Sequence, residues 1–424
     1  MTAQTGADMP TATVRQCAIL AGGLGTRLGA LTATTPKPIL PCGDRPFVAW
    51  LMRELIRFGV TEFLLLTGHL SAEVDRAADA IRSSLPREVR VVVSQEPVRA
   101  GTGGALFHAR DRLAEKFLLC NGDTLFDCNV ADLLAASARG DASALGWMVL
   151  RRLQNASRFG VVSMDRGRIT GFQERPVALS AEEGSPGLIN GGLYLFERAV
   201  LDHLAPVCSL ETEVMPRLAS AGALRGIEAE GYFRDIGVPD DFTRAQTEIP
   251  ALLHRRAVFL DRDGVINVDH GYVGSRDRFE FIPGALETIR YVTRRGWHVF
   301  IVTNQSGVAR GHYAEEAVQD LLEWIADQAR LAGGTIDDAR YCPFHENADV
   351  AAYRRPSDWR KPAPGMLLDL IRRWELAPSR CVMIGDQPSD MAAAEAAGVP
   401  GHLFPGGNLL DFVRPILDRT AVGA

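Results

Sequence analysis

The chain has 424 residues, 46% of them hydrophobic and 23% charged, and its formal net charge is −6. The length predicts two domains, and the charge excludes a general attraction to nucleic acid or to an anionic membrane. No apolar run approaches the ~18 residues that a membrane-spanning helix needs. Residues 1–14 are small and polar, so we expect a disordered leader there instead of a signal peptide. The seven cysteines are scattered and form no Cys-x-x-Cys pair, which predicts a reduced, cytoplasmic setting.

In the first half, short β-rich runs alternate with helical patterns. We expect strands at 16–20, 62–68, 89–94 and 116–123, and helices at 46–59 and 71–85. This alternation predicts parallel strands joined by crossover helices in a layered α/β fold.

The first predicted strand runs into AGGLGTRLGALTATTPKPILP, residues 21–41. Glycines at the carboxyl end of a strand let backbone amides approach phosphate oxygens closely. The turn is not a dinucleotide fingerprint, because Leu28 stands where the third glycine is required. It is not a P-loop either, because the chain contains no Gly-Lys pair. For the glycines alone, a tight surface loop remains the alternative.

Lysine is scarce in this chain: Lys37, Lys116 and Lys361 are the only three among 46 Lys and Arg residues. A lysine retained at the end of the glycine-rich stretch indicates a need for a compact ammonium group there. Compositional drift could also leave a lysine at that position, so the count supports a phosphate site without proving one. Lys116 is interpreted as a solvated cation between a helix and a strand.

Six further motifs follow the glycine-rich turn. They are GTGGAL (101–106), NGDTLF (121–126), GFQERP (171–176), INGGLYLF (189–196), SLETEVMP (209–216) and YFRDIGVPDDF (232–242). With the turn, they resemble the sugar-phosphate nucleotidyltransferases over residues 15–248. The resemblance implies that a sugar 1-phosphate attacks the α-phosphorus of a nucleoside triphosphate and that pyrophosphate leaves.

The resemblance also implies roles for individual residues. Lys37 neutralises charge near the reacting phosphates, and Asp123 and Asp235 bind Mg²⁺. Arg175 stands where the family often has a lysine that clamps the sugar phosphate. The remaining implied contacts are Gly22, Gly23, Gly25, Thr26 and Arg27 with the triphosphate, Gln95, Gly103 and Gly104 with base and ribose, and Glu174 and Asn190 with sugar hydroxyls. GTGGAL, NGDTLF and YFRDIG look most like the motifs of the heptose 1-phosphate and mannose 1-phosphate guanylyltransferases. This likeness favours GTP as the donor.

The second half begins with a new buried-strand signal at 257–260 and continues with strands at 298–304 and 381–386 and a helix at 314–332. Polar residues cluster at the strand ends. They are Asp261 and Asp263, Thr303 and Asn304, and Asp386 and Asp390, and Lys361 follows in WRKPAPGM. Because such strand ends share one edge of a parallel sheet, we expect a single site.

These motifs resemble the haloacid dehalogenase superfamily of phosphatases over residues 257 to about 410. The resemblance implies that Asp261 is the nucleophile, that Asp263 is the acid and base, and that Lys361 neutralises charge. It also implies that Thr303 and Asn304 hold the phosphoryl group and that Arg360 binds substrate. The implied Mg²⁺ ligands are Asp261, Asp263 through its backbone carbonyl, and Asp386, supported by Asp390.

DRDGVIN and TNQSGVARG narrow the resemblance to a small group without a cap domain that includes heptose 1,7-bisphosphate and histidinol-phosphate phosphatases. That group usually carries a zinc loop. Here Phe344 replaces the expected histidine, and Ser357-Asp358-Trp359 replaces a Cys-x-Cys pair. Cys342 and His345 cannot complete a tetrahedral thiolate site, so we expect no structural zinc. Aromatic packing by Tyr341, Phe344, Tyr353 and Trp359 would hold the loop instead.

The sequence therefore predicts a two-domain α/β enzyme. The first domain, 15–248, has a Rossmann-like mixed sheet of the GT-A type, residues 249–256 form a linker, and 257–424 form a parallel Rossmannoid domain. The predicted function is removal of the 7-phosphate of D-glycero-D-manno-heptose 1,7-bisphosphate, then transfer of GMP from GTP to heptose 1-phosphate, with Mg²⁺ in both domains. The alternatives are another sugar phosphate such as mannose 1-phosphate, another nucleoside triphosphate, or a sugar-nucleotide sensor. Nucleic acid and membrane partners are not expected, and a homo-oligomer stays open.

Overall fold

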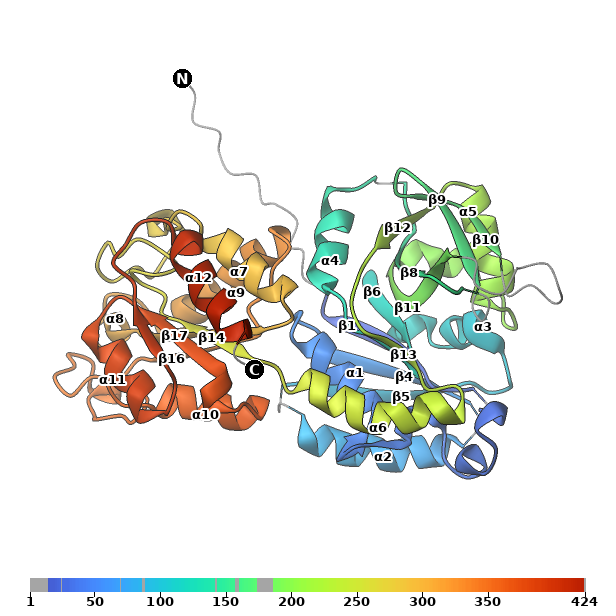
Figure 1. The fold of residues 1–424 in the computed structure, drawn as a ribbon, viewed down its shortest axis with the longest axis horizontal. Helices are drawn as coiled ribbons and strands as arrows, with labels where there is room; N and C mark the ends of the chain where they lie inside the picture. The colour runs from blue at the N-terminus through green and yellow to red at the C-terminus, as the bar shows by residue number, and fades with distance from the viewer. Residues whose placement is uncertain are drawn as a thin grey trace, which may run out of the picture. The chain divides into compact units, whose positions relative to one another are not determined.

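The computed structural model describes residues 14–23, 25–68, 70–85, 88–141, 143–156, 160–173 and 186–422. The described residues fall into two compact units, one ending at Leu253 and the other beginning at His254. Each unit is a mixed arrangement of helices and strands with its own sheet (Figure 1). None of the described helices is long and apolar enough to cross a membrane.

The first unit contains thirteen strands and six α-helices among its described residues. The strands are β1 (Gln16–Leu20), β2 (Pro41–Cys42), β3 (Arg45–Pro46), β4 (Glu62–Thr67), β5 (Arg90–Gln95), β6 (Lys116–Asn121), β7 (Thr124–Phe126), β8 (Gly146–Leu153), β9 (Val161–Asp165), β10 (Arg168–Gln173), β11 (Gly187–Glu197), β12 (Leu224–Glu228) and β13 (Phe233–Asp235). The α-helices are α1 (Phe47–Ile56), α2 (Ser71–Ser84), α3 (Gly101–His108), α4 (Val130–Arg139), α5 (Met215–Ser220) and α6 (Pro239–Leu253).

The main sheet has the order β5-β4-β1-β6-β11-β8-β12-β10-β9. β5, β4, β1 and β6 run parallel, whereas β11 pairs antiparallel with both β6 and β8. An additional β11–β9 pairing closes β11, β8, β12, β10 and β9 into a ring. The predicted mixed sheet is confirmed.

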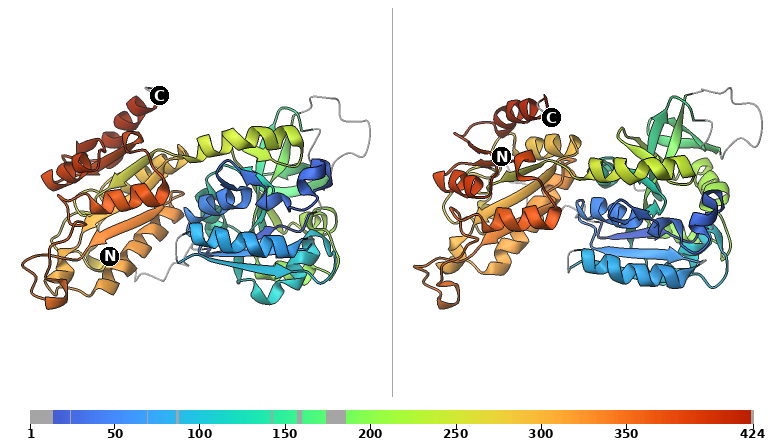
Figure 2. Two further views of the ribbon diagram at one scale, coloured as in Figure 1. Left: turned by 90° about the horizontal axis from the view of Figure 1, so that it is seen from below. Right: turned by 60° about the horizontal axis from the view of Figure 1, so that its bottom comes forward.

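Strand β1 is buried on both faces, as its continuous apolar sequence predicts. Cys17 and Ile19 belong to one core cluster and Ala18 to the other. The first cluster includes side chains of α1 and α6, and the second includes side chains of α3 and α5. Helix α6, yellow-green in Figure 2, therefore shares a core with α1. Because helices cover both faces of the sheet, the carboxyl ends of its parallel strands are left to form the site.

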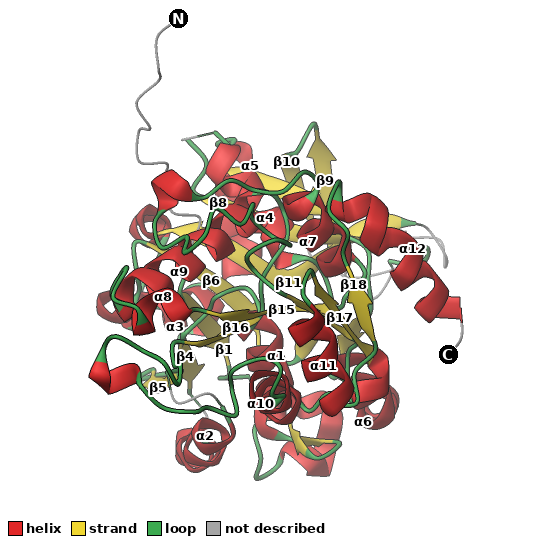
Figure 3. Ribbon diagram, turned by 90° about the vertical axis from the view of Figure 1, so that its left-hand side faces the viewer, coloured by secondary structure: helices red, strands yellow, loops and turns green. Residues whose placement is uncertain are grey.

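The second unit has one five-stranded sheet of order β16-β15-β14-β17-β18 in which every pair is parallel. The strands are β14 (Ala257–Leu260), β15 (His298–Asn304), β16 (Asp338–Cys342), β17 (Cys381–Gly385) and β18 (Gly401–Leu403). The α-helices are α7 (Ala285–Arg294), α8 (Ser306–Ala309), α9 (Glu315–Leu331), α10 (Gly365–Trp374), α11 (Pro388–Ala396) and α12 (Leu409–Val422). Helix α11 lies beside β17 and β18 (Figure 3). This sheet confirms the predicted parallel Rossmannoid fold.

The segment expected to be a linker, 249–256, is helical over its first five residues because α6 extends to Leu253. Pro250 lies inside this helix and removes one backbone hydrogen bond. Ile249 and Leu253 are four residues apart on one helix face, and both are buried in the core. The burial of these two side chains offsets the hydrogen bond lost at Pro250, so the helix continues to the boundary between the units.

Candidate active sites

The glycine-rich turn leaves β1 through a backbone conformation that needs glycine. Gly25 has φ +63°, and a Cβ there would lie 2.7 Å from Cγ2 of Thr32. The Thr32 hydroxyl donates to the Gly25 carbonyl at 2.9 Å, which ties the turn to the following 3₁₀ helix, Thr26–Thr32. In this structure Thr26 and Arg27 start that helix and are exposed.

A cavity of about 330 Å³ lies beside the turn. Its walls come from the ends of β1, β4 and β6, from the segment after β5 and from the first turn of α3. The lining residues are Leu20, Gly22, Gly23, Lys37, Pro38, Leu66, Glu96, Arg99, Gly101, Thr102, Ala105, Asn121, Gly122, Asp123 and Glu211. A cavity at the carboxyl ends of parallel strands is where α/β sheets bind ligands.

The charged groups beside this cavity are paired. Nζ of Lys37, a residue that is 8% exposed, lies 3.0 Å from Oδ2 of Asp123. β13 pairs with β7, so Asp235 is brought to the same place, and the Ile236 amide donates to the Asp123 carbonyl at 2.9 Å. Burial and the neighbouring Asp123 carboxylate raise the pKa of Asp235, while Lys37 and Arg27 act in the opposite direction. Two carboxylates and two cations thus converge from four separate segments.

Other predicted residues of this unit lie elsewhere. The amides of Gly103 and Gly104 donate to the Cys208 carbonyl at 3.0 and 3.1 Å, so these glycines pack α3 against the segment that contains Cys208. Their neighbours Gly101 and Thr102 are the ones that line the cavity. The side chain of Asn190 donates to Tyr194 Oη and accepts from the Gly192 amide, across the bulge in β11.

Gln95 is exposed at the end of β5 and borders a neighbouring cavity with Gly22 and Gly68. Glu96, which was not predicted from the sequence, borders both cavities. Successive residues of an extended chain point to opposite faces, and that alternation could have drawn attention to the residue after Gln95. Glu174 and Arg175 lie outside the described residues.

In the second unit, a buried lysine joins two carboxylates. Nζ of Lys361 lies 2.8 Å from Oδ1 of Asp261 and 2.6 Å from Oδ1 of Asp390. It also donates to the Val302 carbonyl at 3.0 Å. Burial would lower the pKa of Lys361, but the two carboxylates outweigh it and raise the pKa. Burial raises the pKa of Asp261, and Lys361 opposes that shift. The lysine therefore stays charged and holds Asp261 in place.

The same edge of the sheet offers oxygen ligands for a cation. One ligand atom each of Asp261, Asp386 and Asp390 lies within 4.8 Å of the others. Oδ1 of Asp386 is buried and has no hydrogen-bond partner among the described residues. Gly264 has φ +84°, and a Cβ there would lie 2.3 Å from Asp386 Oδ2, so only glycine lets this loop approach so closely. Clustered carboxylates with an unpaired buried oxygen fit a hard divalent ion such as Mg²⁺.

Asp263 is held by several donors. Nε2 of Gln305 donates to Oδ2 of Asp263 at 2.9 Å and to the Thr303 hydroxyl at 2.9 Å. Nδ2 of Asn267 donates to Oδ1 of Asp263 at 3.0 Å, and Arg262 adds an ion pair at 2.8 Å. Gln305 and Asn267 were not predicted from the sequence.

The side chain of Asn304 is hydrogen-bonded to the backbone of Lys361, and its expected contact with the phosphoryl group stays a prediction. Oδ1 of Asn304 accepts from the Lys361 amide and Nδ2 donates to the Lys361 carbonyl, both at 3.0 Å. In this structure both polar ends of its amide are therefore engaged in positioning the lysine segment. Thr303, at the end of the same strand, is 1% exposed.

Arg310 and Arg360 are near enough for their charges to interact. Burial and the guanidinium of Arg310 lower the pKa of Arg360, and burial with both arginines lowers the pKa of His345. Nε of Arg310 is buried and has no hydrogen-bond partner among the described residues. Guanidinium groups bind phosphate through paired hydrogen bonds, so Arg310 and Arg360 are candidates for holding a substrate phosphate. Arg310 was not singled out in the sequence.

The loop after β16 is held by ordinary packing and hydrogen bonds. The Phe344 and Tyr353 rings lie 5.9 Å apart, and the Arg355 guanidinium lies 3.9 Å from the Phe344 ring centre. Nδ1 of His345 accepts from the Asn347 amide at 3.0 Å. Within the described ranges, Cys342 and His345 belong to no group of three metal-ligating side chains. The absence of zinc itself stays a prediction.

The two folds and sites define two classes of enzyme, and the comparisons agree. Residues 17–251 match the nucleotidyl transferase family, and residues 204–398 match the haloacid dehalogenase-like hydrolases. The matches overlap over 204–251, which the structure places in the first unit. The chain thus belongs to the nucleotidyl transferase family, and its second unit to the haloacid dehalogenase-like hydrolases.

Particular relatives of the second unit are D-glycero-beta-D-manno-heptose-1,7-bisphosphate 7-phosphatases. The protein from Rhodopseudomonas palustris is 47% identical over 171 residues, covering 40% of this chain and 95% of that protein. The one from Vibrio cholerae is 46% identical, covering 34% and 77%. Among solved structures, HddC from Yersinia pseudotuberculosis is 27% identical and covers 55% of this chain and 98% of its own, with a TM-score of 0.47.

Proposed function

We propose that this chain carries out two consecutive steps of nucleotide-activated heptose synthesis. The second unit removes the 7-phosphate of D-glycero-D-manno-heptose 1,7-bisphosphate. The first unit then joins the resulting 1-phosphate to GMP from GTP and releases pyrophosphate. The observation that carries the proposal is the buried Asp261–Lys361–Asp390 group in a unit 47% identical to a heptose bisphosphate phosphatase.

In the phosphatase step, a carboxylate oxygen of Asp261 attacks the phosphorus at position 7 and the bond to the sugar oxygen breaks. Asp263 donates a proton to that leaving oxygen and then takes one from the water that hydrolyses the aspartyl-phosphate. Gln305 and Asn267 fix the orientation of Asp263 for both transfers. Lys361 balances the negative charge that accumulates on Asp261 and the phosphoryl group.

Asp261, the Asp263 carbonyl and Asp386 would hold Mg²⁺ there, with Asp390 supporting them, because the buried Oδ1 of Asp386 lacks a partner among the described residues. When bound, the ion neutralises phosphate charge.

The two arginines favour a substrate with a second phosphate. Arg310 and Arg360 would bind the phosphate that is not cleaved, since guanidinium groups bind phosphate through paired hydrogen bonds. Such binding would distinguish a sugar bisphosphate from a simple phosphomonoester.

In the transfer step, a phosphate oxygen of the sugar 1-phosphate attacks the α-phosphorus of GTP, and the bond to the leaving pyrophosphate breaks. Lys37 and Arg27 would stabilise the triphosphate charge beside the backbone of Gly22 and Gly23. Asp123 and Asp235 would hold Mg²⁺. No covalent enzyme intermediate is needed, because positioning of the two substrates and neutralisation of their charge accelerate the transfer.

The test is a product assay with the full chain, Mg²⁺, a panel of sugar phosphates and the common nucleoside triphosphates. We expect fastest phosphate release from the heptose 1,7-bisphosphate and fastest pyrophosphate release with heptose 1-phosphate and GTP. Turnover with UTP, dTTP or ATP more than about tenfold faster than with GTP, roughly 1.4 kcal/mol in barrier, would reject the donor assignment.

A further inference from the structure

The side-chain amide of Gln305 is hydrogen-bonded at both of its ends. Its Nε2 donates to Oδ2 of Asp263 and to the Thr303 hydroxyl, each at 2.9 Å. Its Oε1 accepts from the Tyr313 hydroxyl at 2.9 Å. Gln305 is 1% exposed, so this amide is shielded from bulk water. Tyr313 is thus one hydrogen bond removed from the amide that holds Asp263.

Two glycines make room for the ring of Tyr313. A Cβ on Gly274 would lie 2.2 Å from Cδ1 of the ring, and a Cβ on Gly307 would lie 2.3 Å from its Cζ. These glycines belong to separate segments, and Gly307 follows Gln305 by two residues in α8. Burial raises the pKa of Tyr313 to about 12, so the hydroxyl keeps its proton and can donate it. The close packing fixes the ring, and with it the place of this donor.

The orientation of a glutamine amide is set by its hydrogen bonds. Rotation about the last side-chain bond has only broad, roughly twofold preferences, so the torsion itself does not decide which end faces a partner. An ionised carboxylate only accepts, so the nitrogen end must face Asp263, and the oxygen then needs a donor on its other side. Without the Tyr313 hydroxyl, a buried carbonyl oxygen is left unpaired, which costs free energy and favours movement of the amide.

We propose that Tyr313 is a positioning residue for the acid step of the phosphatase, an inference that rests on the proposed role of Asp263. The Tyr313 hydroxyl keeps the Gln305 amide turned towards Asp263, and the amide keeps the carboxyl group aimed at the leaving oxygen. The proton on Asp263 moves to that oxygen as the bond between it and phosphorus breaks. Loss of the hydroxyl should therefore slow only those substrates whose leaving group needs the proton.

The test compares phenyl phosphate with para-nitrophenyl phosphate as substrates of Tyr313→Phe, using the full chain and Mg²⁺. The two esters are similar in shape, but nitrophenolate is a much weaker base than phenolate and leaves without a proton. The quantity compared is kcat/KM, which reports the steps up to cleavage of the ester bond. We expect it to fall about 3- to 10-fold with phenyl phosphate, the range for one hydrogen bond, and less than about twofold with the nitrophenyl ester. With heptose 1,7-bisphosphate, kcat should fall about as much as with phenyl phosphate, and KM should stay within about twofold.

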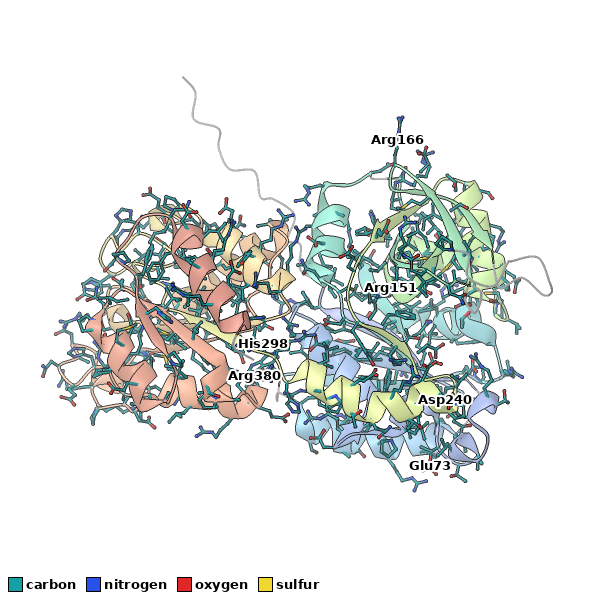
Figure 4. The ribbon with its side chains drawn as sticks, in the orientation of Figure 1. Glu73, Arg151, Arg166, Asp240, His298 and Arg380 are labelled. Carbon is teal, nitrogen blue, oxygen red and sulfur yellow. The ribbon has the colours of Figure 1, made fainter. Side chains whose placement is uncertain are left out.

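Two further variants control for effects that are only structural. Tyr291→Phe removes a hydroxyl that donates to Oδ1 of Asp418 at 2.8 Å, and it should leave both esters within about twofold. His298, labelled in Figure 4, pairs with Asp337 at 2.7 Å at the start of β15, the end of the strand opposite to Gln305. His298→Gln therefore weakens the same sheet away from the site, and any loss should be equal for the two esters. A thermal melt of each preparation checks that the protein is folded.

Asp263→Asn separates the inference from the function on which it rests. With phenyl phosphate it should lower kcat/KM by at least about 100-fold, the lower end of what a general acid contributes, and with the nitrophenyl ester by far less. If it does so but Tyr313→Phe slows both esters equally, or slows neither, the inference is wrong and Asp263 remains the acid. If Asp263→Asn slows both esters equally, Asp263 is not the acid, and the proposed mechanism fails together with the inference.

Discussion

At the scale of single residues, lysine is the rarest basic residue of this chain, and its burial separates the three lysines into two kinds. Two of the three lysines are buried against carboxylates, Lys37 beside Asp123 and Lys361 between Asp261 and Asp390. Lys116 instead pairs with Glu197 while partly exposed to solvent. A compact ammonium fits where several oxygens converge, and a branched guanidinium does not.

Substituting Lys361→Arg should therefore abolish phosphate release even though the charge is kept. Lys361 is 3% exposed and its Nζ already contacts three oxygens, so the larger planar group displaces Asp261. We expect a loss of at least about 1000-fold in kcat, roughly 4 kcal/mol of transition-state stabilisation. Lys116→Arg is the control and should change kcat by less than about twofold. More than a tenth of the original rate in Lys361→Arg would contradict this role.

Arg310→Ala should weaken binding of the bisphosphate selectively. Removing one guanidinium from the pair loses a charge-assisted contact worth about 1.5–3 kcal/mol, so KM for the bisphosphate should rise roughly 10- to 100-fold. Hydrolysis of a generic phosphomonoester should change by less than about twofold, because that substrate has no second phosphate. Arg372→Ala, at an exposed surface ion pair, is the control. An equal loss with both substrates would show that Arg310 has a structural role instead.

At the scale of elements, the sequence predicted those features that a strong local pattern determines. Buried apolar runs such as 16–20 and 257–260 are strands in the structure, and the predicted starts of α2 and β15 are correct. The extent of α6 was not predictable, because a buried apolar face overrode Pro250. The side-chain partners of Asn304 and the packing of Gly103 depend on segments distant in sequence, which a local pattern does not contain.

The loop after β16 carries its own prediction. Since Phe344, Tyr353 and Arg355 pack together, the loop should keep its shape without a structural metal. Elemental analysis of the purified protein should find less than about one equivalent of zinc, because two ligands are too few for a closed tetrahedral site. Phosphatase activity should survive a strong zinc chelator when Mg²⁺ is in excess. Stoichiometric zinc whose removal abolishes activity would show that Cys342 is a ligand.

At the scale of the whole molecule, each unit contains its own sheet, its own core and its own set of carboxylates with a buried lysine. Neither set of charged groups needs a residue from the other unit. Two separate reactions in one chain therefore need no shared site. We propose that the intermediate, heptose 1-phosphate, is released by the second unit and bound by the first.

The most direct test of two independent, consecutive sites is to measure nucleotide-sugar formation by Asp261→Asn and Asp123→Ala. Each variant is given two different starting substrates. Asp261→Asn should form no nucleotide sugar from heptose 1,7-bisphosphate and GTP, but should form it from heptose 1-phosphate at a rate within about twofold of the unaltered protein. Asp123→Ala should release phosphate from the bisphosphate at a rate within about twofold of the unaltered protein and form no nucleotide sugar from either substrate. If Asp261→Asn forms nucleotide sugar from the bisphosphate, or if a folded form of either variant loses both activities, the account of two independent, consecutive sites is contradicted.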